Sequence, residues 1–315
     1  MSLLSQGLAL FSGRRATHTT HLQDMLRSLL VMAWMVEARD PYTGGHLWRV
    51  SQFAHLLADA AGLPPEDIAR ITLGGFLHDL GKVGIPDQIL KKRGALDDDE
   101  YALVKTHPDL GWRLLAGHPL AALVHAAVRA HHETPDGHGY PRGLVSKNIP
   151  LDARIIGICD AFDAMTSSRP YRRGMPTAQA LDIIASRLGT QFDQLHGDHF
   201  IALGRQGLLD PIVGHSDQGI PLQECLTCGP LLVLRREQQV GDRIYCRNCG
   251  AEYLATPEGD RLQCKPSGRR GNPEALEAEA DMALINRFIA DSASALLLDK
   301  VCSIRHVSFT RHPAH

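Results

Sequence analysis

The sequence predicts an all-α domain, followed by a small β region and a C-terminal helix. Apolar residues recur with helical spacing from Leu22 onward, and strand patterns are scarce up to about residue 208. Short strand patterns between two Cys-x-x-Cys pairs indicate the β region, and an Ala- and Leu-rich stretch from Leu276 to Leu298 indicates the last helix. A chain of 315 residues with 44% hydrophobic content is long enough for one large core and a small module.

The helices of the first domain are predicted from apolar stripes that stop at Pro or Gly. Three stripes come first: Leu22–Trp34, which stops before Asp40-Pro41; Val50–Ala61, which stops at Gly62; and a helix opened by Pro64-Pro65 that carries His78 and Asp79 near its end. Four further helices are expected over Asp97–Lys105, Pro119–His131, Pro150–Met165 and Thr177–Leu188. Asp97 and Thr177 are the expected N-cap residues, and Gly189 is the expected residue after the last of these helices.

Changes of composition divide the chain into five predicted segments. These are residues 1–20, without clear periodicity and a candidate for disorder; 21–208, the helical domain; 209–220, a linker; 221–265, the small β domain; and 266–315, a linker, helix and tail. The stretch "PLLVLRREQQVGDRIYC" predicts two short strands around a Val-Gly-Asp turn. The stretch "PSGRRGNPE", from Pro266 to Glu274, is interpreted as the second linker, and residues after Lys300 fit no element.

The charge and the apolar runs exclude some classes of protein. The formal net charge is -2 and the pI is about 6.8, so we expect no strong attraction to nucleic acid or to an anionic membrane. The apolar run Leu29–Val36 is too short to span a bilayer, and no small-residue cleavage site follows an apolar core near Met1. We therefore expect a cytoplasmic protein, and the sequence does not predict its oligomeric state.

Histidine is unusually frequent, at 17 of 315 residues, and several His and Asp residues fall at ends or inward faces of predicted helices. The candidates are His46, His78, Asp79, His107, His131, His132 and Asp160. Helix bundles commonly build metal sites from such positions. Nitrogen and carboxylate ligands suit Fe, Mn, Ni or Zn better than Ca or Mg. Taken singly, His107 before Pro108 is also typical of a turn, and His131-His132 of a surface.

Four motifs extend this pattern. They are "EARDPYTGGHLWRV" (Glu37 to Val50), "HDLGK" from His78, "HHETPDGHGYPRGL" (His131 to Leu144) and "DARIIGICDAFDAMTSSRPYR" (Asp152 to Arg172). Together they resemble the HD-GYP family, the branch of the HD-domain superfamily that hydrolyses cyclic di-GMP. The resemblance covers roughly Leu22 to Arg205. One departure is His138, which stands in the DGxGYP loop where Ser or Thr is commoner.

The resemblance implies a role for each candidate. His78 and Asp79 are the HD pair, and Asp79 would bridge two metals; His46 and Asp160 would complete one metal site, and His107, His131 and His132 the other. Asp79 and Lys82 are the implied catalytic residues, with Lys82 facing the scissile phosphate. Lys82, Gly139, Tyr140, Pro141, Arg169 and Arg172 are the implied substrate-binding residues. Some relatives carry Glu at the position of Tyr42 and can hold a third metal, so two catalytic metals are expected here.

The implied activity is metal-dependent hydrolysis of cyclic di-GMP to linear pGpG. A hydroxide that bridges the two cations would attack phosphorus in line, because metal binding lowers the pKa of water toward neutrality. Further cleavage to GMP stays open. Two alternatives are a signalling scaffold that binds a nucleotide or partner with little turnover, and a hydrolase of another nucleotide. The intact ligand set disfavours the first alternative, and the GYP loop favours cyclic di-GMP over the second.

A second metal site is predicted by "CLTCG" and "CRNCG", which frame 17 residues, a spacing typical of zinc ribbons. Four thiolates, from Cys225, Cys228, Cys246 and Cys249, would hold one structural zinc with no open position for catalysis. Four unrelated buried cysteines are the alternative. Nearby arginines are diluted by acidic residues, so we expect a protein-contact or regulatory module rather than a nucleic-acid reader. Its zinc is expected to be independent of the catalytic metals.

Overall fold

The computed structural model describes residues 21–40, 43–92, 94–168, 172–229 and 231–296. The predicted N-terminal segment 1–20, the tail after residue 296, Tyr42 and Arg169 lie outside these ranges. Residues 21–37 are helical. The helices that follow are α2 (His46–Ala60), α3 (Pro65–Leu77), η1 (Leu80–Gly84), α4 (Asp87–Leu90), α5 (Asp98–Val104), α6 (His107–Leu115), α7 (Ala121–Ala130), η2 (Ser146–Asn148), α8 (Leu151–Thr166), α9 (Thr177–Ser186) and α10 (Gln194–Arg205).

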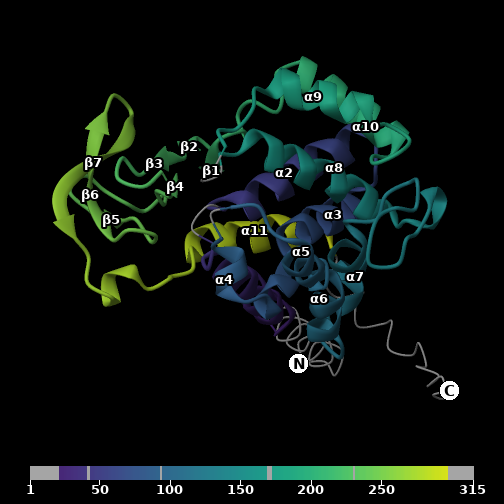
Figure 1. Ribbon diagram of the computed structural model, residues 1–315, viewed down its shortest axis with the longest axis horizontal. Coiled ribbons are helices and arrows are strands. Elements are labelled where there is room, and N and C mark those ends of the chain that lie inside the picture. Colours follow the sequence, from purple (N-terminus) through teal and green to yellow (C-terminus); the bar gives the residue numbers. More distant parts are fainter. Residues whose placement is uncertain (1–20, 41–42, 93, 169–171, 230, 297–315) are drawn as a thin grey trace, which may run out of the picture.

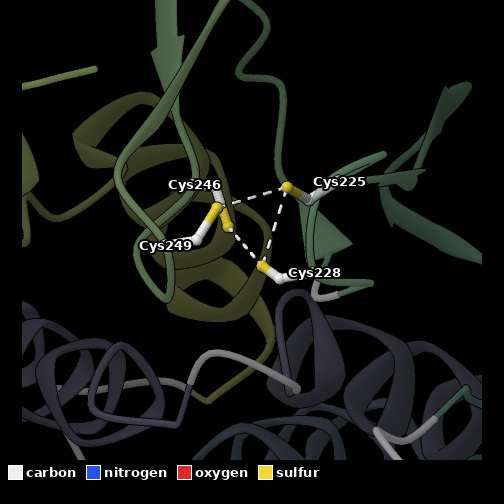
Figure 2. A group of neighbouring side chains, drawn as sticks. All are labelled: Cys225, Cys228, Cys246 and Cys249. Atoms are coloured by element: carbon white, nitrogen blue, oxygen red, sulfur yellow. Dashed lines mark hydrogen bonds between the residues drawn. The ribbon is translucent and has the colours of Figure 1, made fainter.

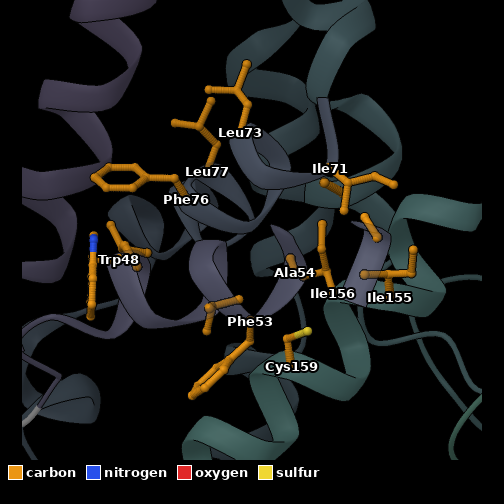
Figure 3. Close-up of a cluster of buried hydrophobic side chains, with 14 of the residues drawn as sticks. Trp48, Phe53, Ala54, Ile71, Leu73, Phe76, Leu77, Ile155, Ile156 and Cys159 are labelled. Carbon is orange, nitrogen blue, oxygen red and sulfur yellow. The ribbon is translucent and has the colours of Figure 1, made fainter. Parts of the chain in front are cut away.

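Helices α2 and α3 lie at the centre of the helical region, with α7 and α8 packed against them. The apolar stripes predicted from the sequence face one core, and part of that core is drawn in Figure 3. The rings of Phe53 and Phe162 pack edge to face with centroids 5.2 Å apart, which joins α2 to α8. This core fixes the ends of the helices, where the candidate metal ligands lie.

The helix boundaries follow local signals closely. Asp97 caps α5 as predicted, because its side chain accepts from the N–H of Glu100, whose carboxylate accepts from the N–H of Asp97 in return. The prediction that Thr177 caps α9 is wrong. Thr177 is already the first helical residue and the extended Pro176 is the N-cap, since proline needs no N–H partner at a helix start.

The β region, defined here as residues 215–270, lies beside the helical region (Figure 1). It contains three small antiparallel sheets, with the strand pairs and order β1–β2, β3–β4 and β5–β6–β7. The strands are β1 (His215–Asp217), β2 (Ile220–Pro221), β3 (Gln223–Glu224), β4 (Leu231–Leu232), β5 (Arg243–Tyr245), β6 (Ala251–Glu258) and β7 (Arg261–Arg270). Its own apolar cluster includes Leu232, Ile244 and Tyr253.

Several predictions about this part of the chain are wrong. The predicted linker 209–220 contains β1, and the predicted linker from Pro266 begins inside β7, which continues to Arg270. The two strands expected around a Val-Gly-Asp turn exist, but β4 pairs with β3 and β5 pairs with β6. Each of these two strands pairs with its other neighbour in the chain, so the Val-Gly-Asp turn does not join a hairpin.

The C-terminal helix α11 (Met282–Ala295) begins later than predicted and belongs to the large core rather than to a separate tail. Leu284, Ile285, Phe288 and Ile289 are buried there, and α11 packs against α3 (Figure 1). The ring of Phe288 lies 5.0 Å from that of Phe76. The chain therefore leaves the helical region at β1, builds the β region and returns.

Candidate functional site

The seven His and Asp candidates, called the His/Asp cluster below, converge from five segments of the helical region. His46 and His107 are the first residues of α2 and α6, His78 and His131 are the C-cap residues of α3 and α7, and Asp160 lies within α8. Asp79 directly follows His78, and His132 directly follows His131. Helix ends place the side chains at the rim of the core, and most of these residues are buried.

The ligand atoms form two groups. The nitrogen or oxygen atoms of His46, His78 and Asp79 lie within 4.8 Å of one another, and so do those of His107, His131 and His132. Asp160 joins the first group, because its Oδ1 atom lies 3.5 Å from Nε2 of His46 and 3.8 Å from Nε2 of His78.

Asp79 lies between the two groups. Its Oδ2 atom is 3.5 Å from Nε2 of His78 and 3.6 Å from Nε2 of His46. Its Oδ1 atom is 3.4 Å from Nε2 of His107 in the other group. One carboxylate thus directs one oxygen to each set of imidazoles, as a ligand shared by two cations would.

The imidazoles are oriented by hydrogen bonds at their Nδ1 atoms. These atoms lie 2.8 Å from the carbonyl of Gly75 for His78, 2.8 Å from that of Val104 for His107 and 2.9 Å from that of Ala127 for His131. A carbonyl only accepts, so each Nδ1 carries a proton and a neutral ring has its lone pair on Nε2. Those lone pairs point into the cluster.

This arrangement fits bound cations. Nε2 of His78 is buried and has no hydrogen-bond partner among the described residues. The Nε2 atoms of His107 and His131 face each other at 3.2 Å, where two lone pairs repel unless a cation lies beside them. Ligating histidines in metal proteins donate their other N–H to a fixed acceptor in the same way.

The two groups differ in electrostatics. Burial opposes protonation of His46, but the carboxylates of Asp163, Asp79 and Asp160 outweigh it and raise its pKa to about 9. Burial lowers the pKa of His107 to about 4 and that of His132 to about 3. The first group is therefore rich in carboxylates, whereas the second presents neutral imidazoles.

Lys82 lies one turn after the HD pair, in η1, and its Nζ atom donates to Oδ2 of Asp79 at 2.5 Å. Burial alone would raise the pKa of Asp79, but the charge of Lys82 and of the neighbouring imidazoles holds it well below its usual value. The carboxylate thus stays ionised, and an ammonium group lies at the edge of the cluster.

The predicted loop residues Gly139, Tyr140 and Pro141 lie over His132. The ring of Tyr140 stacks on that of His132 with centroids 4.7 Å apart. The backbone N–H of Tyr140 donates to the carbonyl of His132 at 3.1 Å. A side chain at Gly139 would overlap the backbone of residues 132–134, so glycine allows this close approach. The Tyr140–Pro141 peptide is cis.

Glu133 was not predicted as a site residue. It is buried, and its carboxylate accepts the N–H groups of Arg142 at 2.8 Å and Leu144 at 2.7 Å. It thereby fixes the chain just after the Tyr140 loop. The available signal was its position, directly after His131-His132 and inside an otherwise flexible-looking Gly- and Pro-rich stretch.

Arg49 and Asp163 were also missed. Both are 1% exposed, and Asp163 accepts from Nδ1 of His46 at 2.8 Å and from Nε of Arg49 at 2.5 Å. Each lies three residues after a predicted ligand, His46 or Asp160, and so on the same helix face. Opposite charges at matching positions on two helices were the signal that the pattern offered.

Of the two predicted arginines, only Arg172 falls within the described ranges. It is partly buried and donates to the carbonyl of Ala164 at the end of α8, at 2.5 Å. This contact ties the chain after α8 back to the helix.

The four predicted cysteines, called the cysteine cluster below, point toward one another (Figure 2). The Sγ atom of Cys225 lies 3.6 Å from that of Cys249 and 3.7 Å from that of Cys228, which lies 3.5 Å from that of Cys246. Disulfide-bonded sulfurs would be about 2.0 Å apart, so these thiols are free. The hydroxyl of the buried Tyr253 donates to Cys225 at 3.2 Å.

Within the described ranges, no helix combines the length and the apolar character needed to cross a lipid bilayer.

Curated relatives match the helical region. The chain is 42% identical over 164 residues to the cyclic di-GMP phosphodiesterase response regulator RpfG of Xanthomonas campestris, covering 51% of this chain and 43% of that protein. It is 35% identical over 190 residues to a cyclic di-GMP phosphodiesterase of Thermotoga maritima, covering 59% and 52%. It is 38% identical over 175 residues to the 3'3'-cGAMP-specific phosphodiesterase 3 of Vibrio cholerae, covering 55% and 38%. The chain thus spans about half or less of the length of these relatives.

The family comparison covers the same region. The HD domain family matches residues 30–195, more than half of the chain and a range that contains every member of the His/Asp cluster. The HD pair and the GYP loop lie together in the folded chain, as described above. The chain therefore belongs to the HD domain family.

Proposed function

We propose that this protein is a metal-dependent phosphodiesterase that hydrolyses cyclic di-GMP to linear pGpG. The observation that carries the proposal is the position of Asp79, whose two oxygens face two separate groups of imidazoles. Two-metal sites of this kind serve phosphodiester hydrolysis by clamping the phosphate.

We assign two divalent cations to the His/Asp cluster. His46, His78, Asp79 and Asp160 would hold one, and Asp79, His107, His131 and His132 the other. The mixture of imidazole and carboxylate suits Fe, Mn, Ni or Zn. When bound, such cations lower the pKa of water and neutralise the negative charge of a phosphodiester.

The chain's own residues have separable tasks in this proposal. Asp79 stays ionised and holds the two halves of the site together. Lys82 offsets charge on the phosphate oxygens from the rim of the cluster, where electrostatic stabilisation of a developing charge is most effective. Gly139, Tyr140 and Pro141 form a wall beside His132 that orients the dinucleotide. Arg169 and Arg172 are proposed to bind its phosphates or guanines.

A second candidate substrate is 3'3'-cGAMP, because one of the relatives is named as specific for it. The two cyclic dinucleotides share the phosphodiester and differ in one base. The His/Asp cluster acts on the phosphodiester in either case, so the choice between them depends on residues that contact the bases. Of the three relatives named above, the one with the highest identity, at 42%, is named as a cyclic di-GMP phosphodiesterase, which favours cyclic di-GMP.

The test is a turnover assay with the purified full chain and Mn²⁺. Cyclic di-GMP and 3'3'-cGAMP are supplied separately and together, and products are separated by liquid chromatography, with Asp79→Asn as the inactive control. We expect pGpG from cyclic di-GMP and a preference for this substrate in the mixture. A preference for 3'3'-cGAMP would overturn the substrate and keep the chemistry. Tight nucleotide binding without product formation, in metal-loaded protein, would favour the alternative of a signalling scaffold that binds a nucleotide with little turnover.

For the cysteine cluster we propose one structural zinc. Zinc bound to four thiolates at about 2.3 Å places neighbouring sulfurs about 3.8 Å apart in a tetrahedron. The distances of 3.5 to 3.7 Å between the sulfurs support this geometry. The β region has a small apolar cluster, so the metal would contribute to its folding.

A further inference from the structure

The turn that presents His46 is in close contact with the β region. A Cβ atom on Gly44 would lie 2.6 Å from Cγ2 of Val233, and one on Gly45 would lie 2.7 Å from Cα of Ser216. Carbon atoms do not approach so closely, so only glycine permits this packing. Gly45 is also the N-cap of α2 and has a positive φ of 75°. The two residues before a proposed metal ligand thus form an interface between the helical and β regions.

Arg49 uses all five of its N–H groups, and one of them reaches the β region. Nε and one Nη2 N–H donate to the two oxygens of Asp163, and the second Nη2 N–H donates to Oγ of Ser167. The Nη1 atom donates to the carbonyls of Gly44 and His215, each at 2.9 Å. A guanidinium has five donors, so none is left over.

These contacts form a continuous path from the β region to the metal ligand. The carbonyl of His215, in β1, is bound by Arg49, which pairs with Asp163, which accepts from Nδ1 of His46. Each charged side chain on the path is buried. A carboxylate that accepts the outer N–H of a ligating histidine fixes the orientation of the ring. The β region therefore contributes to that orientation through Arg49.

The cysteine cluster and the interface share the segment around β3 and β4. Cys225 and Cys228 lie in the connection between β3 and β4, and Val233 directly follows β4. Asp217 of β1 is buried and accepts from Nε of Arg236 at 3.1 Å and from Arg287 of α11. A cavity of about 360 Å³ lies beside the interface and is lined by Gly44, Gly45, Val233 and Trp34 among others. The contact at the two glycines is therefore local rather than part of a broad apolar interface.

We propose that the β region positions the turn that carries His46. Val233 packs against Gly44 in this turn, and Arg49 is the positioning residue that links β1 to His46. The inference rests on the proposed assignment of His46 to a cation. The sequence analysis expected the structural zinc to be independent of the catalytic metals. In this proposal, the cation bound by the first group of ligands depends on the β region. Disruption of the β3–β4 hairpin, which Val233 directly follows, weakens metal binding by the first group of ligands, which contains His46. Metal binding by the second group, which contains His107, is unchanged.

A size-compensation experiment tests this proposal. The full chain and the variants Gly44→Ala, Val233→Ala and Gly44→Ala/Val233→Ala are dialysed against graded Mn²⁺, and bound Mn and Zn are measured separately in each sample. Gly94→Ala is the matched control, because no atom lies within 4 Å of a Cβ at Gly94. Metal binding is measured without substrate, so the result does not depend on whether the protein hydrolyses cyclic di-GMP.

Gly44→Ala is expected to weaken one of the two Mn²⁺ sites by about tenfold, the range seen when support of a metal ligand is lost. The other Mn²⁺ site and the single zinc should be retained. Val233→Ala removes the clashing Cγ2 atom, so the double variant should recover most of the lost affinity. Unchanged Mn²⁺ affinity in Gly44→Ala, or a loss that the second substitution does not restore, overturns the proposal.

Arg49→Lys provides a second variant should Gly44→Ala not fold. Lysine keeps the charge beside Asp163 but offers three donors in place of five, so the bond to the His215 carbonyl cannot be kept together with the others. One Mn²⁺ site is expected to weaken about tenfold while the zinc stays. Two Mn²⁺ sites of unchanged affinity in this variant would contradict the linking role of Arg49.

Discussion

The His/Asp cluster draws its ligands from five segments between residues 46 and 160, whereas the cysteine cluster draws all four from two turns within residues 225–249. The first set is held by helix ends that pack into the large core. The second set lies on short connections between strands whose apolar cluster is small. In the helical region the fold positions the ligands. In the β region the ligands are expected to hold the fold.

The hydrogen bonds around the ligands show the same difference. Four imidazoles of the His/Asp cluster have their Nδ1 atoms fixed by protein acceptors: His46, His78, His107 and His131. Among the cysteines, the Cys225 sulfur accepts from the hydroxyl of Tyr253, and the sulfurs of Cys225 and Cys246 also accept from backbone N–H groups of their own turns. The acceptors of the imidazoles belong to helices of the helical region, whereas the donors to the sulfurs belong to the small β region, whose folding would depend on the metal. The predictions below test this contrast.

The largest effect is expected for Asp79→Asn. The amide keeps the size of the side chain but removes the charge that faces both groups of imidazoles. Two-metal clamping contributes several kcal/mol to the transition state, so turnover should fall by about 10³-fold or more. Element analysis should show loss of Mn²⁺ from the His/Asp cluster and retention of one zinc. Full turnover in this variant would mean that Asp79 is not shared by two metals.

Lys82→Ala should separate chemistry from metal binding. Removing a cation aimed at the reacting phosphate typically costs about 10²-fold in rate, and Lys82 is not among the proposed ligands. We expect kcat to fall by that amount with both Mn²⁺ ions bound. Lys91→Ala is the matched control, because Lys91 forms an exposed ion pair with Asp87 and should behave as wild type. Loss of Mn²⁺ in Lys82→Ala would show that Lys82 supports the metals instead.

The features that depend on residues close together in the chain could be predicted from the sequence. Helix starts are set by residues within one turn, so the capping role of Asp97 could be predicted. The ligand types are also local, because HD, HH and CxxC pairs are adjacent or nearly so in the chain. The roles that the resemblance assigned to them stay predictions until metals and substrate are bound.

Contacts between segments that are far apart in the chain could not be predicted from the sequence. The return of α11 to the core depends on partners far along the chain. Arg49 lies in an apolar stripe between Leu47 and Val50, and only the folded chain places Asp163 and the His215 carbonyl around it. The supporting residues of both clusters therefore emerged from the structure.

Cys225→Ser/Cys228→Ser tests the cysteine cluster. We expect complete loss of the zinc and rapid proteolysis within residues 221–265, because a structural zinc contributes folding free energy directly. The helical core should keep its thermal transition. Through Val233 and Gly44, turnover should also fall by about tenfold. Cys264→Ser is the control, since Cys264 is buried beside this cluster but outside the four. Retention of the zinc by the double variant would mean that the four thiols do not form one site.

The smallest effect is expected for Glu133→Gln, which tests whether the loop beside the His/Asp cluster is preorganised as the imidazoles are. The glutamate accepts the N–H groups of Arg142 and Leu144 with its two oxygens, whereas glutamine has one accepting oxygen. A buried N–H left without a partner costs about 1–3 kcal/mol, which the loop can relieve by moving away from His132. KM for cyclic di-GMP should therefore rise by about tenfold while Mn²⁺ and zinc contents stay constant. Asp136→Asn is the matched control from the same loop, because its carboxylate is more exposed and should change KM little. A fall in kcat at unchanged KM would instead place Glu133 in the chemical step, and loss of Mn²⁺ would place it among the supports of His132.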